Sequence, residues 1–270
     1  MEKIDFNQNR NLSEIISSSI QFLKAEGKSL FKFYFRFLFI LFIPVAILTY
    51  NSDLFAIGEL IREDITQLEA MLPSFNLKGV FLAVLAQALA WLVFLSITLV
   101  YVRNYCTQNS KPLSNKEMWN QMFYEFPKLF IVQFFYISMF IFGLVTFVIP
   151  GIYFGVSLAL TATIIVFEDA RIFQGLSGSI KLTRSKWFMC LGYLLVFYLV
   201  YIVARTLLQL PISFIGTSLS NSGELTRMSF TIVSTLNAII NMLATIFPIL
   251  GSVFLYHILK QQQVKTPKAY

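Results

Sequence analysis

Six long runs of apolar residues constrain this chain more than any other feature of its sequence. They cover residues 30–49, 79–102, 129–149, 152–167, 187–210 and 230–259. A hydrocarbon core about 30 Å thick takes about 20 helical residues, and within lipid only helices or closed barrels satisfy every backbone group. Barrel strands would alternate polar and apolar residues, and these runs do not. We therefore predict an all-α, polytopic transmembrane helical bundle with six spans.

The third and fourth runs are separated only by Pro150-Gly151. A single helix over residues 129–167 would greatly exceed one crossing, and a Pro-Gly pair is typical of a turn. The sequence therefore predicts a helical hairpin that turns at this dipeptide.

The distribution of basic residues predicts the orientation. In the six-span arrangement, 17 of the 21 Lys and Arg fall in the N-terminal segment with the adjoining start of the first run, the second-to-third and fourth-to-fifth connections and the C-terminal tail. Basic residues are retained on the cytoplasmic side, so we expect a bacterial inner-membrane protein with both termini cytoplasmic. Residues 1–29 would be a cytoplasmic amphipathic segment, 30–259 the six-helix domain and 260–270 a cytoplasmic tail.

The net charge of +7 raises the question of a nucleic-acid partner. The basic residues are spread over four separate segments, which fits anionic lipid headgroups better than a nucleic acid. Apolar residues at helical spacing also predict amphipathic interfacial helices at 12–23 and 172–182 inside, and at 54–72 outside. We expect membrane lipids as partners, with a membrane protein as a further possible partner.

Two kinds of residue stand out within the spans. Small residues let helices approach closely, and polar residues at depth bind ligands or hydrogen-bond neighbouring helices. Asn237 and Asn241 are one turn apart, so they share a helix face and fit either role. Arg205 is near enough to the end of its predicted span to reach the interface. The candidate polar site comprises Asn237, Asn241, Gln87, Gln133 and Arg205. The candidate packing residues are Gly151, Gly155, Ala159, Ala83, Ala86 and Ala90, within the chain or in a dimer.

No catalytic motif is present in the sequence. It contains no HExxH, no Cys/His cluster, no GxSxG and no glycine-rich phosphate loop, so we predict no catalytic residue, no metal and no cofactor. Glu168 and Asp169 follow the fourth run and form a candidate interfacial charge cluster with Arg171 and Arg184. We expect these acids to cap a helix or to pair with Arg171 or Arg184; cation binding is the alternative.

Part of the chain resembles a known family. The residues concerned are Pro150-Gly151-Ile152-Tyr153, Ile164-Ile165-Val166-Phe167-Glu168, Gly175-Leu176, Ser179-Ile180-Lys181-Leu182-Thr183-Arg184 and Trp187. They resemble bacterial six-helix proteins related to the membrane domain of glycerophosphoryl diester phosphodiesterases. The resemblance implies a six-helix fold and a membrane location. Hydrolysis in the fused phosphodiesterases belongs to a separate barrel domain, which has no counterpart here.

Three functional hypotheses follow. The first is a non-enzymatic membrane protein that organises or assists partners or lipids, suggested by the amphipathic segments and the lack of catalytic motifs. The second is a transporter or lipid-handling protein with a polar site near Asn237 and Asn241. The third is a membrane-embedded lipid enzyme.

Overall fold

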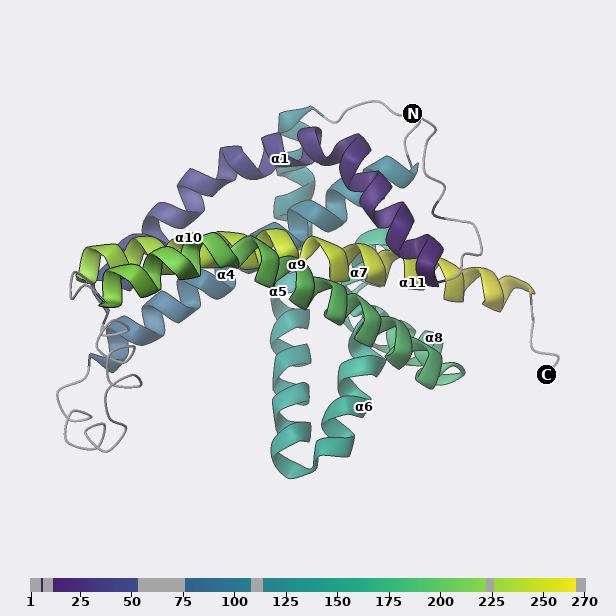
Figure 1. Cartoon of the computed structure of the whole chain (residues 1–270). Helices are drawn as coiled ribbons and strands as arrows, with labels where there is room; N and C mark the ends of the chain where they lie inside the picture. Colours follow the sequence, from purple (N-terminus) through teal and green to yellow (C-terminus); the bar gives the residue numbers. More distant parts are fainter. Residues whose placement is uncertain (1–5, 7–11, 53–75, 108–113, 222–225, 266–270) are drawn as a thin grey trace. The chain divides into compact units, whose positions relative to one another are not determined.

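The computed structural model describes residues 6, 12–52, 76–107, 114–221 and 226–265 (Figure 1). The regular elements in these residues are all α-helices, which confirms the predicted all-α class. They are α1 (Leu12–Tyr50), α4 (Leu77–Thr107), α5 (Asn115–Thr146), α6 (Val148–Leu158), α7 (Thr161–Glu168), α8 (Ile172–Arg184), α9 (Trp187–Asn221), α10 (Arg227–Ala244) and α11 (Ile246–Lys265).

The chain forms two compact units. One comprises Met1–Lys32, Leu92–Tyr201 and Thr245–Tyr270, and the other comprises Phe33–Trp91 and Ile202–Ala244. The first therefore contains all of α5, α6, α7, α8 and α11, and the second contains α10. Helices α1, α4 and α9 contribute to both.

Five helical segments among the described residues are long and apolar enough to cross a membrane. A sixth is reached if Leu12–Arg36 and Leu41–Tyr50, which are bent by 53° at their break, count as one span. The protein is thus a helical, multi-pass membrane protein. The predicted fourth run comprises α6 and α7, and the predicted sixth run comprises α10 and α11. The predicted outer amphipathic stretch at 54–72 lies outside the described residues.

The predicted domain boundaries at 29/30 and 259/260 fall inside helices. Helix α1 continues from the amphipathic N-terminal stretch into the first apolar run, and α11 extends to Lys265. The apolar runs mark the part of a helix suited to lipid, whereas the backbone continues its hydrogen bonds into polar sequence on either side.

The hairpin between α5 and α6 turns at Phe147, three residues before the predicted position. Phe147 has extended backbone angles of φ −157° and ψ 135°, and Pro150 lies in the first turn of α6. Proline is tolerated there because the first helical N–H groups have no partner within the helix. The prediction of a hairpin between these runs agrees with the structure, but its turn position was wrong.

Close packing holds the α5–α6 hairpin together. A Cβ atom added to Gly143 would lie 2.6 Å from the Cα of Gly151, and one added to Gly151 would lie 2.7 Å from the backbone nitrogen of Leu144. One added to Gly155 would lie 3.1 Å from the ring of Phe140. The two backbones therefore approach to a distance that only glycine allows.

The α6–α7–α8 segment packs around a break in the predicted fourth span. Helix ends leave carbonyl groups without an intrahelical partner, and Ser179 on α8 donates to the carbonyl oxygen of Ser157 at 2.7 Å. A Cβ atom on Gly175 would lie 2.5 Å from Ile165, so glycine brings α8 close to α7. Leu160, Ile164, Leu182, Cys190 and Leu255 belong to one cluster of buried apolar residues in this unit.

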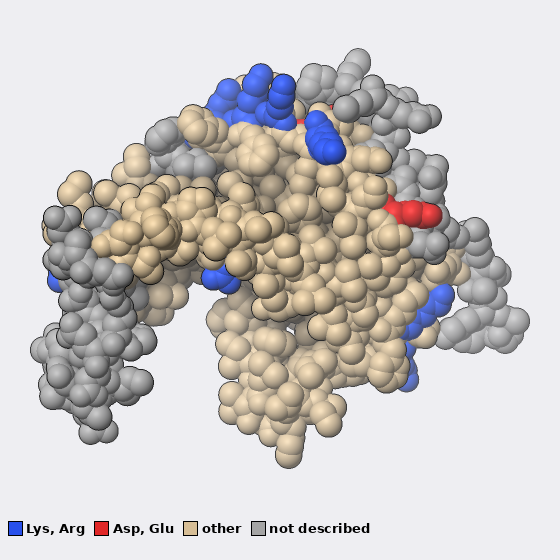
Figure 2. Space-filling model, viewed as in Figure 1, with Lys and Arg blue, Asp and Glu red and all other residues tan. Residues whose placement is uncertain are grey.

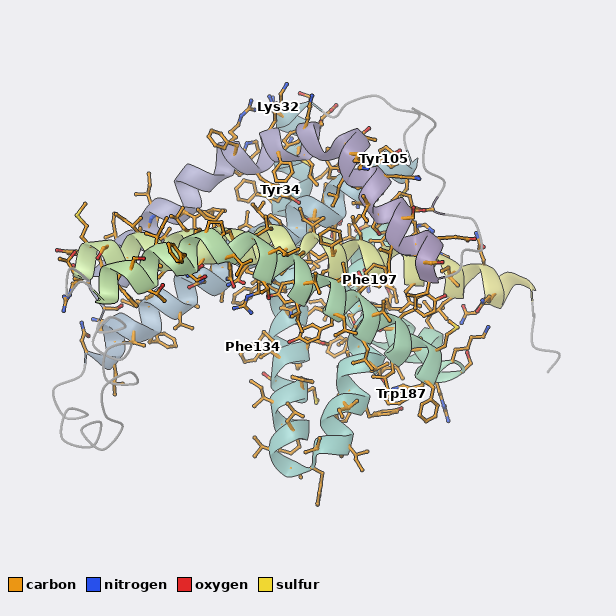
Figure 3. The ribbon with its side chains drawn as sticks, viewed as in Figure 1. Lys32, Tyr34, Tyr105, Phe134, Trp187 and Phe197 are labelled. Carbon is orange, nitrogen blue, oxygen red and sulfur yellow. The ribbon has the colours of Figure 1, made fainter. Side chains whose placement is uncertain are left out.

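The projecting part of the hairpin is apolar. Residues 129–158 contain no charged residue, and this part of the hairpin is uniformly tan in Figure 2. Phe134 projects outward from α5 and is 66% exposed (Figure 3), and Ile149 at the turn is 81% exposed. Large apolar side chains exposed in this way fit contact with lipid tails.

Candidate functional site

The C-terminal end of α7 directs two adjacent carboxylates to different helices. Asp169 has a left-handed backbone conformation with φ 49° and ψ 38°, and its N–H donates to the carbonyl of Ile165. Aspartate adopts this conformation more readily than most non-glycine residues. The left-handed residue ends α7 and separates the side chain of Asp169 from that of Glu168.

Glu168 connects α7 to α11. Its Oε1 accepts a hydrogen bond from the Tyr256 hydroxyl at 2.7 Å and from Lys260 Nζ at 2.8 Å. Nζ also lies 2.8 Å from the Tyr256 oxygen, so the three groups form a closed triangle. The side chains of Glu168 and Lys260 are 40% and 50% exposed, so the triangle lies at the surface of its unit.

Asp169 connects α7 to α5. Its Oδ1 accepts a hydrogen bond from Lys128 Nζ at 2.6 Å. This hydrogen bond holds the pKa of Asp169 below its ordinary value of 3.8 because it favours the ionised carboxylate. The carboxylate therefore stays charged at neutral pH.

Glu125 lies one helical turn before Lys128 on α5 and is buried, with a side chain only 1% exposed. Its Oε1 accepts a hydrogen bond from Arg103 Nη1 at 3.1 Å, and its Oε2 lies 3.3 Å from Lys128 Nζ. Arg103 also donates to the Val166 carbonyl at 2.9 Å and to Gln121 at 3.1 Å. A buried carboxylate is stable only with such partners, so Glu125 ties α4 and α5 to the end of α7.

Sequence reasoning missed Glu125, because the predicted third span begins at residue 129 and this acid therefore fell in the connection before it. A signal was present: Glu125 and Lys128 are three residues apart, which places them on one helix face. Arg103 was counted only as a topology signal. Its pairing with Glu125 joins residues 22 positions apart, so no local pattern reveals it.

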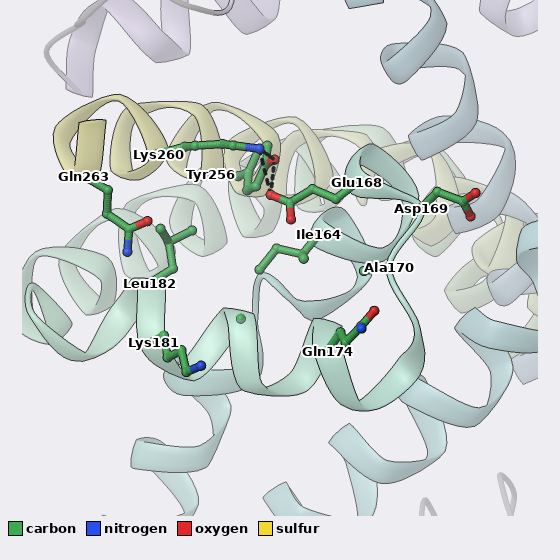
Figure 4. A pocket seen from close by; sticks show the side chains of 11 residues that line it. Ile164, Glu168, Asp169, Ala170, Gln174, Lys181, Leu182, Tyr256, Lys260 and Gln263 are labelled. Carbon is green, nitrogen blue, oxygen red and sulfur yellow. Dashed lines mark hydrogen bonds and ion pairs between the residues drawn. The ribbon is translucent and has the colours of Figure 1, made fainter. Parts of the chain in front are cut away.

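A pocket of about 410 Å³ opens beside the Glu168 triangle. Glu168, Tyr256 and Lys260 line one side, and Lys181 on α8 lies across the pocket from them (Figure 4). Ile164 and Leu182 supply apolar lining. The pocket belongs entirely to one compact unit.

The predicted pairing of Glu168 and Asp169 with Arg171 and Arg184 was wrong. The acids pair with Lys260 and Lys128, which lie 92 and 41 positions away. The backbone N–H of Arg171 donates to Gln174 at the start of α8, and Arg184 lies exposed in the last turn of α8. Neither arginine has an ion pair with another described residue. Chain folding brings lysines closer to these acids than their neighbours in sequence.

The candidate polar intramembrane residues are only partly brought together. Arg205 Nε donates to Gln209 at 3.2 Å, and Gln209 Nε2 donates to Asn241 at 3.3 Å. Gln209 therefore joins α9 to α10, although it was not among the predicted site residues. Asn237 is half-buried one turn before Asn241. Gln87 is exposed on α4. Gln133 belongs to the other compact unit.

The candidate packing residues lie in two places. Gly151, Gly155 and Ala159 follow one another along α6 and its end, and the two glycines contact α5 as described above. In α4, Ala83 and Ala90 are 2% and 1% exposed, and Ala86 is half-buried.

The structure brings no metal-binding group together in the part of the chain that it describes: no three His, Cys, Asp or Glu residues lie close enough to hold an ion. His257 packs against the rings of Phe167 and Tyr256, with centroid separations of 5.4 and 5.2 Å. The acids at the end of α7 accept hydrogen bonds from lysines and a tyrosine. This arrangement suits fixed charges that bind a polar group at the surface.

Comparison with known proteins supports one assignment. Neither the search of curated proteins nor the search of solved structures gives a match. A family model described as "Domain of unknown function (DUF7847)" matches residues 77–259, which is more than half of the 270-residue chain. This chain therefore belongs to the DUF7847 family.

Proposed function

We propose that this protein is a non-enzymatic integral protein of a bacterial inner membrane that organises lipids or membrane partners at its cytoplasmic face. Both termini and the loops between the second and third and the fourth and fifth spans would lie in the cytoplasm. The observation that carries the proposal is a group of charged and polar side chains that we call the α7–α8 platform. It comprises Glu168 and Asp169 at the end of α7, helix α8, and the side chains from α4, α5 and α11 that bind the end of α7, namely Arg103, Lys128, Tyr256 and Lys260.

The cationic groups of the platform support this orientation. Arg103 and Lys128 lie at the two ends of the second-to-third connection, Lys181 lies in the fourth-to-fifth connection, and Lys260 begins the tail. The basic-residue rule assigns these three stretches to the cytoplasmic side. They lie in one compact unit, together with the end of α7.

Helix α8 has the character of a helix at a lipid surface. Phe173 and Ile180 are 77% and 38% exposed, although both are strongly apolar. Lys181 and Arg184 lie in the last turn of the same helix. Apolar side chains exposed beside basic ones are typical of a helix that rests in the headgroup region of a membrane.

The state of the acids supports binding rather than catalysis. A general acid or base needs a proton that moves near neutral pH. Asp169 is held ionised by Lys128, and Glu168 is bound by Lys260 and Tyr256. Paired charges of this kind shape a surface and hold a fixed polar ligand.

Purification of the full chain from native membranes tests the proposal. We expect specific lipids or a membrane protein to remain bound in stoichiometric amount, detected by native mass spectrometry. Reporters fused after Asn109 and after Ser220 should give opposite sidedness. A protein that always purifies alone and without retained lipid would contradict the organising role, and equal sidedness would contradict the topology.

A transporter is the second candidate, favoured by the polar chain from Arg205 through Gln209 to Asn241. An Asn241→Cys variant on a background of Cys106→Ser and Cys190→Ser discriminates the two. Labelling by a membrane-impermeant thiol reagent from both sides would support alternating access, whereas protection from both sides would indicate a structural hydrogen bond between α9 and α10. The resemblance to the phosphodiesterase membrane domain favours neither candidate, because it implies only fold and location.

A further inference from the structure

We propose that the pocket between α7, α8 and α11 binds a phosphoethanolamine group, in which a phosphate bearing one negative charge lies beside an ammonium. The proposal rests on the function proposed above and names the chemistry that its platform recognises. The group is carried either by a lipid headgroup or by a soluble ester.

The size of the pocket fits a headgroup. Its volume of about 410 Å³ is within the range of about 300–1,000 Å³ found for small-molecule sites. Ile164 and Leu182 line it beside the charged groups, so it also offers apolar contact to the carbon atoms of a ligand. A headgroup can enter such a pocket while its acyl chains stay outside in lipid.

Two lysines supply the phosphate contacts. Lys260 has three N–H donors, of which two are used by Glu168 and Tyr256, so one remains for a ligand. Lys181 has no ion pair with another described residue, and it lies across the pocket (Figure 4). A phosphate between them would accept charge-assisted hydrogen bonds from both sides.

A carboxylate supplies the contact to an ammonium. Both hydrogen bonds of Glu168 reach Oε1, and its other oxygen points toward the interior of the pocket in Figure 4. The carboxylate would repel a ligand that brings only negative charge. It would attract an ammonium placed next to the phosphate, so the pocket favours a dipolar headgroup over a purely anionic one.

The charge balance leads to the same ligand. Glu168 is paired with Lys260, and Asp169 is paired with Lys128. Lys181 therefore provides the one lining charge without a partner among the described residues. One positive charge beside a carboxylate that still has an accepting oxygen matches one phosphate and one ammonium. The exposed Phe173 and Ile180 on α8 place the pocket next to a lipid surface in the proposed topology.

Headgroup competition on the purified full chain in nanodiscs tests the proposal. Native mass spectrometry would count retained phosphatidylethanolamine, phosphatidylglycerol and phosphatidylcholine from an equal mixture, and calorimetry would measure binding of glycerophosphoethanolamine, a soluble diester whose phosphate also bears one negative charge. We expect the wild type to prefer the ethanolamine lipid or to bind the soluble ester. Binding to the lipid alone or to the ester alone identifies the source, and either supports the site.

Three variants separate the contacts. K181Q should weaken ethanolamine binding about 10- to 150-fold, since hydrogen bonds to charged groups contribute about 1.5–3 kcal/mol, and K181R should restore it. E168Q should retain phosphate binding and shift the preference toward phosphatidylglycerol. R184Q is the matched control, because it removes a cation from the same helix turn without altering the pocket lining.

The results that would overturn the proposal are distinct from those that would overturn the proposed function. If the wild type neither prefers the ethanolamine lipid nor binds the soluble ester, or if its binding equals that of K181Q, the pocket assignment is refuted. The organising role would stand if lipid or a partner protein were still retained in that case. Melting curves in detergent would establish that each variant is folded.

Discussion

Replacement of Gly143 by alanine should destabilise the α5–α6 hairpin, although alanine is the better helix former. The added Cβ would lie 2.6 Å from the Cα and 2.7 Å from the backbone nitrogen of Gly151. These are backbone atoms that cannot rotate away, so α6 must move by about 0.8 Å to reach an ordinary 3.4 Å contact. Such overpacking costs about 1–3 kcal/mol, and alanine regains about 1 kcal/mol of helix propensity. The expected net loss is up to about 2 kcal/mol.

Gly192→Ala is the matched control, because a Cβ at Gly192 would meet nothing within 4 Å. It should stabilise α9 by up to about 1 kcal/mol through helix propensity alone. The free energy of unfolding in mixed SDS micelles, followed by circular dichroism, would measure both variants. If G143A were as stable as G192A, the close backbone contact of the hairpin would be refuted.

Three further predictions concern the α7–α8 platform. Glu125→Gln should lower the free energy of unfolding by about 3 kcal/mol, because it leaves Arg103 and Lys128 without their buried counterion. Asp169→Asn should lower it by no more than about 1 kcal/mol in the same assay, because the Asp169 side chain is 61% exposed. The pKa of Asp169 is lowered in the folded state, so its stabilising effect is present above its unfolded pKa and is lost as pH falls through its folded pKa. The stability difference between wild type and D169N should therefore shrink on acidification below about pH 4. A difference that is independent of pH would contradict the ion pair. Ser179→Ala should lower the free energy of unfolding by about 1–3 kcal/mol, since it removes the donor to the buried Ser157 carbonyl. The Ser177 hydroxyl is exposed on the same helix, so Ser177→Ala should leave the free energy of unfolding unchanged within about 0.5 kcal/mol.

Local sequence was a good guide where the physical cause is local. The Ser114-Asn115-Lys116-Glu117 segment begins α5, and the Ser114 N–H donates to Glu117 Oε2 at 3.0 Å, as expected of a capping box. The helical character of the apolar runs likewise follows from the residues within each run. Proline was a poorer guide. Pro150, which was predicted to mark the turn of the hairpin, lies within the first turn of α6.

The candidate site illustrates the limit of such reasoning. Glu168 and Asp169 stood out because they are charged residues at the end of an apolar run, and the structure places both at the pocket or its edge. The partners predicted for these two acids were wrong, because the prediction chose Arg171 and Arg184 for their proximity in sequence. The left-handed conformation of Asp169, which sends the two acids to different helices, leaves no signal in a single sequence.

The sequence by itself determined that this protein is a bundle of membrane helices, because a backbone in lipid must bond to itself and each apolar run is long enough to cross or nearly cross the bilayer. Only the tertiary structure decided that Arg103, Glu125, Lys128, Glu168 and Lys260 meet at the end of α7. Ion pairs form between whichever charged groups helix packing brings within about 4 Å, and that packing depends on contacts such as Gly143 with Gly151 and Gly175 with Ile165. Such contacts join residues that are separate in the chain, so their consequences become visible only in three dimensions.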